Sequence, residues 1–276
     1  MTANIEAQDK FLTVNNLRLH YLDWGGQEAQ PMVLLHGMTG TCHSWDFFAS
    51  AMRRDYHVLA LDQRGHGDSQ WADSYAADDF LADLDAFLDA LGLDRVILIG
   101  HSMGGRNAIM YAARYRAKVT HLVSVDIGPE IGQAGLERIR QTRAAEPPVF
   151  GNLEAARRYI RLGEPRYSEA VLEHQLRHSL RERPDGKLEF KCDGQFLTMS
   201  VSRPPVEELW SYVRQLTCPT LIVRGALSDI LLHDVALGMQ QKVPNSRLVE
   251  IEGAGHSVPC DNPEAFEAAV RHFLHS

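Results

Sequence analysis

The segment from residue 96 to residue 116 constrains the fold of this chain more than any other. It opens with an apolar run, residues 96–99 (Val-Ile-Leu-Ile), which is typical of a parallel strand buried on both faces. Residues 100–104, Gly-His-Ser-Met-Gly, match G-x-S-x-G, and a helical pattern follows up to residue 116. A strand, a sharp turn and a helix are the context in which this pattern holds a nucleophilic serine. Gly100 and Gly104 fit that turn, since a Cβ would clash where strand and helix approach closely. Ser102 is therefore the candidate nucleophile; the alternative is an incidental serine in a glycine-rich turn.

Segments with strand and helix patterns alternate along most of the chain. Two short segments around Asn15-Asn16 alternate in polarity and predict an antiparallel hairpin. Alternation of the later strands with helices predicts right-handed crossovers and a mostly parallel sheet with helices on both faces. The expected strands are residues 11–14, 17–22, 32–35, 58–61, 96–99, 119–125, 220–224 and 248–251, and the expected helices are residues 45–53, 75–91, 103–116 and 263–273.

The pattern changes between residues 130 and 210. Strand-like runs are absent there, and arginine-rich, helix-like stretches are interrupted by prolines. A helical segment inserted between two strands of an α/β core is typical of a lid over the active-site edge, although plain decoration of the fold gives the same pattern. We therefore expect a core of residues 1–129 and 211–276 and a helical lid, or cap, of residues 130–210.

Composition and charge narrow the classes of function. The 276 residues are 45% hydrophobic and 23% charged, which is ordinary for a globular protein. A formal net charge of −8 argues against nucleic acid or an anionic membrane surface as a partner. No apolar run of 18 residues occurs, and the polar N-terminus lacks the apolar centre of a signal peptide. We expect a cytoplasmic protein, a monomer or a homodimer, whose partner is a small-molecule substrate.

The spacing of the cysteines and the absence of metal and nucleotide motifs narrow the classes of function further. The four cysteines contain no C-x-x-C pair, so isolated reduced thiols are expected, with two disulfides as the alternative. Neither H-E-x-x-H nor a clustered His/Asp set with ligand spacing occurs, so no metal is expected. The glycine-rich nucleotide motifs are also missing, so no cofactor is expected. The cysteines are Cys42, Cys192, Cys218 and Cys260.

A serine nucleophile needs a histidine base and an acid that fixes the tautomer of the base. Of the thirteen histidines, His256 follows the last expected strand and precedes the final helix, where a loop can bring it to Ser102. Two acids follow neighbouring strands, Asp126 after residues 119–125 and Asp229 after residues 220–224. A turn-forming aspartate and a helix N-cap, respectively, are the alternative roles of these two residues.

The motifs together resemble those of the α/β-hydrolase superfamily over nearly the whole chain. They are His36-Gly37 after the third strand, Asp-Gln-Arg-Gly-His-Gly-Asp-Ser at 62–69, the serine motif at 100–104 and Gly-Ala-Gly-His at 253–256. The resemblance implies an eight-stranded sheet with an inserted lid, and a cofactor-free enzyme. It also implies an oxyanion hole formed by two backbone amides, those of Met38 and Met103.

A closer similarity is to a subgroup of small-acid hydrolases and esterases that includes (acetamidomethylene)succinate hydrolase. It rests on Gly-His-Ser-x-Gly-x-Arg-Asn at 100–107 and on Asp-Ile-Gly-Pro at 126–129. This similarity favours Asp126 as the acid, whereas the usual site in the superfamily corresponds to Asp229. Substrate contacts are expected from His36 and Gly37, which also fit a tight turn after a strand, and from four lid residues, Arg138, Arg143, Tyr159 and Trp210.

The leading hypothesis is a serine hydrolase that acts on a small ester or amide through an acyl-enzyme. A carboxylated substrate is expected if a lid arginine points into the pocket, where a guanidinium binds a carboxylate in bidentate geometry. Hydrolysis of a carbon–carbon bond in a ring-cleavage ketone, or of a lactone, would use the same residues. The non-enzymatic alternative is a ligand-sensing receptor with a hydrolase fold.

Overall fold

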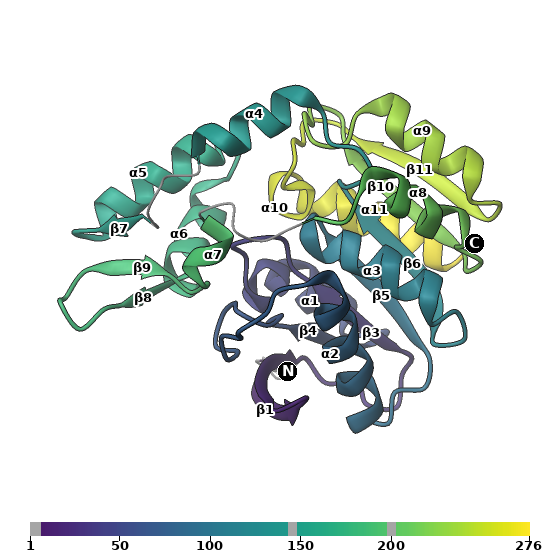
Figure 1. The fold of residues 1–276 in the computed structure, drawn as a ribbon, viewed down its shortest axis with the longest axis horizontal. Helices are drawn as coiled ribbons and strands as arrows, with labels where there is room; N and C mark the ends of the chain where they lie inside the picture. The colour runs from purple at the N-terminus through teal and green to yellow at the C-terminus, as the bar shows by residue number, and fades with distance from the viewer. Residues whose placement is uncertain (1–6, 143–147, 198–202) are drawn as a thin grey trace.

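A computed structural model of this chain describes residues 7–142, 148–197 and 203–276. Figure 1 shows a central sheet flanked by helices, and a smaller body of helices and short strands that continues from α4 (Gln133–Thr142). This smaller body lies in sequence between β6 (Val119–Val125) and β10 (Thr220–Gly225), which nevertheless pair directly in the sheet. We refer to residues 133–197 as the insertion and to the other described residues as the core.

The central sheet has eight strands in the order β1-β2-β4-β3-β5-β6-β10-β11. The pairings β1/β2 and β2/β4 are antiparallel, and every pairing from β4 to β11 is parallel. The predicted eight-stranded, mostly parallel sheet is therefore confirmed. Its other strands are β1 (Gln8–Val14), β2 (Leu17–Asp23), β3 (Pro31–Leu35), β4 (His57–Leu61), β5 (Val96–His101) and β11 (Ser246–Ile251).

Helices cover both faces of this sheet. In β3, Val33 and Leu35 belong to a core cluster with residues of α2, α3, α8 and α9, whereas Met32 and Leu34 belong to a cluster with residues of α1 and α11. Because helices cover both faces, the central strands β3, β4 and β5 consist almost entirely of apolar residues. The core helices are the 3-10 helix η1 (Cys42–Trp45), α1 (Asp46–Met52), α2 (Ala77–Ala90), α3 (Met103–Arg114), α8 (Val206–Arg214), α9 (His233–Lys242), α10 (Val258–Asp261) and α11 (Pro263–Leu274).

Helix α8 packs with the core, and the boundary predicted at residue 210 falls inside it. Leu209 and Val213 are buried in the same cluster as the residues of α3. Trp210 lies on this helix and donates a hydrogen bond from Nε1 to Glu130 at 2.8 Å. Its ring covers Gly238 of α9, where an added Cβ would lie 3.2 Å from the indole. The apolar face of α8 therefore completes the core rather than the insertion.

The insertion contains a second sheet, which the sequence did not predict. Three short antiparallel strands in the order β7-β9-β8 pack with α5 and α6 around a separate apolar cluster that includes Phe150, Ile160 and Leu176. The strands are two or three residues long, and β8 and β9 each include a charged residue, so they contain no apolar run. The insertion elements are α4 (Gln133–Thr142), β7 (Val149–Phe150), α5 (Leu153–Gly163), α6 (Glu169–His178), β8 (Leu180–Glu182), β9 (Leu188–Phe190) and α7 (Gly194–Leu197).

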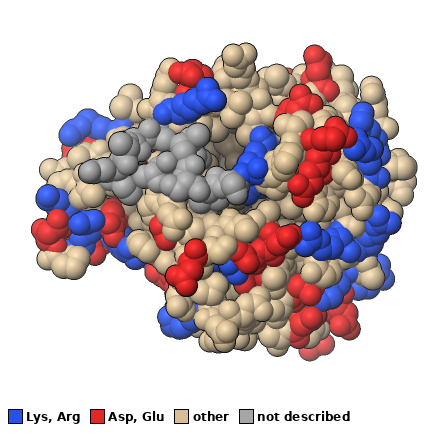
Figure 2. All heavy atoms as spheres, in the orientation of Figure 1, with Lys and Arg blue, Asp and Glu red and all other residues tan. Residues whose placement is uncertain are grey.

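Two further expectations can be compared with the structure. All four cysteines are unbridged, as predicted, and all four are buried. Among the described residues no helix is long and apolar enough to cross a membrane. Figure 2 shows acidic and basic side chains intermixed over the face on view, so the net charge of −8 is not concentrated in one acidic patch on that face.

Candidate active site

Ser102 occupies a sharp turn between β5 and α3. Its backbone has φ 53° and ψ −116°, a strained conformation for a residue with a side chain. A Cβ at Gly100 would lie 2.3 Å from the carbonyl oxygen of Gly104, and a Cβ at Gly104 would lie 2.3 Å from that of Leu35. The two glycines therefore allow strand, turn and helix to approach closely, as the sequence predicts.

Three side chains from three separate loops meet at this turn. The Ser102 hydroxyl lies 2.9 Å from Nε2 of His256, and Nδ1 of His256 lies 2.8 Å from Oδ2 of Asp126. Asp126 is fully buried and also accepts hydrogen bonds from the Gly225 amide and the Ser228 hydroxyl. Because a carboxylate only accepts, Nδ1 of His256 carries a proton and Nε2 is left to accept the Ser102 proton.

Asp229 lies near this group but does not contact the imidazole. Both of its carboxylate oxygens accept hydrogen bonds from Arg138 of α4, each at 2.8 Å. This bidentate contact holds the pKa of Asp229 below its usual value. Asp229 is also not the N-cap of α9, because Leu232 occupies that position. Of the two candidate acids, the structure brings Asp126 to His256 and Asp229 to the insertion.

The two predicted oxyanion amides belong to residues near Ser102, Met103 next to it in the chain and Met38 in the wall of the same cavity. Ser102 is the N-cap of α3, so Met103 is the first helical residue and its amide has no partner within the helix. The positive end of the helix dipole is at the same position. Met38 follows β3 and lines the cavity above Ser102. This geometry suits a site where negative charge develops on a substrate oxygen.

A cavity of about 550 Å³ lies above Ser102 and His256, and its walls come from both the core and the insertion. Four of the predicted substrate contacts line it, namely His36, Gly37, Arg138 and Tyr159. Trp210 does not line it, because its helix packs on the core, and Arg143 lies outside the described residues. Other lining residues include Thr39, Gln141, Ile160, Leu162, Glu164, Tyr167, Phe190 and Phe196.

Two histidines, the buried His36 and the half-buried His101, hold the loops around Ser102 in place. His36 donates from Nδ1 to the Gly37 carbonyl at 2.7 Å and accepts at Nε2 from the Gln63 amide at 3.0 Å, which fixes the loop before Met38. His101 donates from Nε2 to the carbonyl of His256 at 2.8 Å. Burial, together with the nearby charge of His256, lowers the pKa of His101 to about 3, so this ring is neutral. His101 therefore holds the backbone of the base in place.

Glu164 is a cavity residue that sequence reasoning missed. It follows α5, accepts a hydrogen bond from the Ser257 hydroxyl at 3.0 Å and lines the cavity beside His256. Burial raises the pKa of this carboxyl, and the charge of His256 opposes the rise. No motif marks Glu164, because its position depends on how the insertion folds over the core.

Comparison with known proteins supports a single family. A family model described as alpha/beta hydrolase fold matches residues 30–263. The solved structure of E-2-(acetamidomethylene)succinate hydrolase superposes with a TM-score of 0.87 at 23% identity, covering 98% of this chain and 100% of that one. The fold that the motifs predict is therefore confirmed.

Two curated relatives match most of the chain. A 3-hydroxybutyrate-oligomer hydrolase of Cupriavidus necator is 28% identical and the match covers 93% of this chain and 92% of the relative. A 2-(acetamidomethylene)succinate hydrolase of Mesorhizobium japonicum is 26% identical, and the match covers 88% and 87%. The predicted resemblance to the subgroup that contains this second enzyme is also confirmed.

Proposed function

This chain belongs to the α/β-hydrolase fold family and is an enzyme of the hydrolase type, and we propose that it is a cofactor-free serine hydrolase of a small carboxylated ester or amide. The observation that carries the proposal is the chain of two hydrogen bonds from Ser102 through His256 to Asp126 at the base of a cavity. Serine, imidazole and buried carboxylate in this order are the machinery of acyl transfer.

Acylation follows from the positions of these atoms. His256 Nε2 removes the proton of Ser102 as Oγ attacks the substrate carbonyl, and Asp126 stabilises the imidazolium that forms. The amides of Met38 and Met103 donate to the oxyanion, and each such donor contributes roughly 3–4 kcal/mol in the transition state. The imidazolium then gives its proton to the leaving alcohol or amine, which departs and leaves an acyl-enzyme.

Deacylation uses the same groups in reverse roles. His256 removes a proton from a water molecule, and the hydroxide attacks the acyl carbonyl while the two amides again hold the oxyanion. When the intermediate collapses, Ser102 leaves and recovers its proton from His256. The carboxylic acid product is released and the site returns to its starting state, without metal or cofactor.

The substrate class is inferred from the walls of the cavity and from the relatives. The insertion contributes Tyr159 and Ile160 as apolar wall residues, so it acts as a cap that encloses a small substrate. Arg138 of α4 also lines the cavity, and Asp229 holds its guanidinium in place through two hydrogen bonds. A substrate carboxylate can share the Arg138 guanidinium with Asp229. A succinate derivative is the substrate named for one relative, and an oligomeric hydroxy ester for the other.

Labelling with a fluorophosphonate tests the nucleophile. The reagent is expected to modify Ser102 in the wild type, and Ser102→Ala is expected to lose the label and at least about 10³-fold of the turnover of p-nitrophenyl acetate. Ser179→Ala is the matched control, because Ser179 lines the same cavity but donates its hydroxyl to the Gln175 carbonyl. Labelling of Ser102→Ala at wild-type yield would disprove the assignment.

A further inference from the structure

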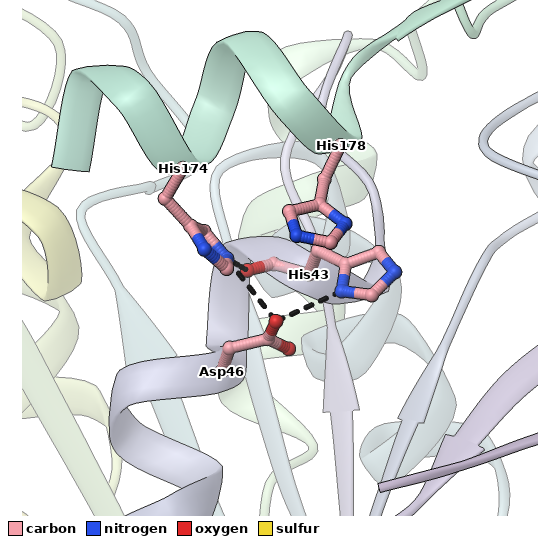
Figure 3. A group of neighbouring side chains, drawn as sticks. All are labelled: His43, Asp46, His174 and His178. Atoms are coloured by element: carbon pink, nitrogen blue, oxygen red, sulfur yellow. Dashed lines mark hydrogen bonds and ion pairs between the residues drawn. The ribbon is translucent and has the colours of Figure 1, made fainter. Parts of the chain in front are cut away.

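Three histidines and one aspartate gather where the insertion meets the core, outside the candidate active site. His43 lies in η1 and Asp46 begins α1, whereas His174 and His178 lie one turn apart on α6. Figure 3 shows the four side chains pointing toward one another from these two segments. One potential ligand atom from each residue lies within 4.8 Å of all the others. All four side chains are half-buried.

The aspartate is the centre of this cluster. Its Oδ2 lies 2.8 Å from Nδ1 of His43 and 3.1 Å from Nε2 of His174. His178 stacks on His43 with ring centroids 3.8 Å apart, and its ring centroid lies 4.5 Å from that of His174. Within the described part of the chain, Oδ1 of Asp46 is buried and has no hydrogen-bond partner. A buried carboxylate oxygen without a partner is costly, which indicates a missing ligand.

We propose that His43, Asp46, His174 and His178 form a binding site for a transition-metal ion, with Zn²⁺ as the best fit. Imidazole nitrogens with one carboxylate suit zinc and its neighbours, whereas Mg²⁺ and Ca²⁺ prefer oxygen ligands alone. Zinc bound tetrahedrally at about 2.0–2.1 Å separates its ligand atoms by roughly 3.3 Å, so short side-chain rotations suffice. The ring nitrogens that face Asp46 are Nδ1 of His43 and Nε2 of His174, and the second also lies 3.1 Å from the His43 carbonyl. To bind the ion through these nitrogens, each ring takes its other neutral tautomer, with the proton on the ring nitrogen that does not ligate.

A site with four protein ligands is closed, so this ion is structural rather than catalytic. It joins α6 of the insertion to η1 and α1 of the core. Residues next to the ligands on the same elements line the active-site cavity, namely Ser44 and Trp45 in η1, Gln175 in α6 and Ser179 directly after it. Metal binding therefore fixes one wall of that cavity against the core and limits how far the insertion opens.

Zinc titration of the chelator-treated full-length chain by calorimetry tests the site. The expected result is one Zn²⁺ per chain, with Co²⁺ giving the visible absorption of a tetrahedral complex at the same site. His178→Ala is the most informative variant, because it leaves the Asp46 contacts to His43 and His174 in place. Loss of a direct ligand is expected to weaken zinc binding by about 100-fold or more, since even outer partners of ligands contribute 10–100-fold.

The controls separate this site from the fold and from catalysis. His275→Ala, at an exposed position, should bind zinc as the wild type does. Zinc should raise the melting temperature and slow hydrogen exchange in α6 of the wild type, but not of His178→Ala. Ser102→Ala should keep full zinc affinity. The test of the zinc site is therefore independent of whether Ser102 is the catalytic nucleophile. Unchanged affinity in His178→Ala, or no saturable binding in the wild type, would overturn the proposal.

Discussion

Two aspartates at the ends of neighbouring parallel strands show how the same sheet edge serves two purposes. Asp126 directly follows β6 and Asp229 follows β10 by four residues, and the two strands pair side by side. Asp126 is fully buried and faces His256, whereas the side chain of Asp229 is one-third exposed and faces Arg138 of the insertion. One carboxylate belongs to the chemistry of the core and the other connects the core to the insertion.

The difference lies in the donors around each carboxylate. Asp126 has φ 50°, which turns its side chain toward the loop of His256, and three donors surround it, the Gly225 amide, the Ser228 hydroxyl and the imidazole. Asp229 has a single cationic side chain as its main partner. The position of an aspartate at the sheet edge therefore does not determine its role. Its role depends on which hydrogen-bond donors surround its carboxylate.

The largest expected effect is that of Asp126→Asn. An asparagine amide at this position favours the wrong tautomer of His256, a change that costs about 10⁴-fold in kcat in a related triad. Steady-state kinetics with p-nitrophenyl acetate measures it. Asp229→Asn is the matched variant and should retain kcat within a few-fold. An inactive Asp229→Asn together with an Asp126→Asn that turns over at the wild-type rate would show that Asp229, and not Asp126, is the acid that acts with His256.

A smaller effect is expected on substrate choice. Arg138→Ala should reduce the preference for a carboxylated substrate over its methyl ester by about tenfold, the value of one charge-assisted hydrogen bond. Asp229→Asn should increase the same preference, because it leaves the guanidinium to the substrate. The ratio of kcat/KM for the two substrates is the measurement. Opposite shifts in the two variants support a shared arginine, and identical ratios in all three proteins would refute it.

The smallest effect concerns acid stability. The hydrogen bonds from Arg138 lower the pKa of Asp229, so the pair stabilises the fold above the unfolded pKa of about 3.9 and loses this contribution as the pH falls through the lowered value. Because both side chains are about one-third exposed, we expect less than about 1 kcal/mol. Urea unfolding should show Asp229→Asn less stable than wild type at pH 7, and this difference should shrink as the pH falls below the lowered pKa of Asp229. A difference that persists in acid would exclude the ion pair as its source.

Local patterns in the sequence were sufficient to predict the fold of the core. Buried parallel strands require continuous apolar residues, and a nucleophile turn requires glycines where backbones touch, so both leave marks within a few residues. The eight-stranded sheet and the glycines around Ser102 are accordingly predicted and found. The sequence also named Ser102, His256 and two candidate acids, and the structure brings Asp126 of the two to His256. Their catalytic roles are those that we propose.

Parts of the insertion left no such marks. Strands of two or three residues, such as β7 and β8, are too short for a periodic pattern. The predicted lid ended at Trp210, whereas the apolar face of α8 packs this helix against the core. The position of the Glu164 side chain depends on where α5 ends relative to the active site, and no local sequence pattern predicts it.

The sequence by itself determined the fold of the core and a short list of candidate residues, because both follow from contacts between residues close in the chain. The tertiary structure alone distinguished Asp126 from Asp229, since each is defined by partners roughly a hundred residues away. It also gathered His43 and Asp46 with His174 and His178, a set that no ligand-spacing motif shows because about 130 residues separate its halves. Side chains from distant segments come into contact only when tertiary packing brings their helices and strands together. The number of residues between them in the sequence does not predict that contact.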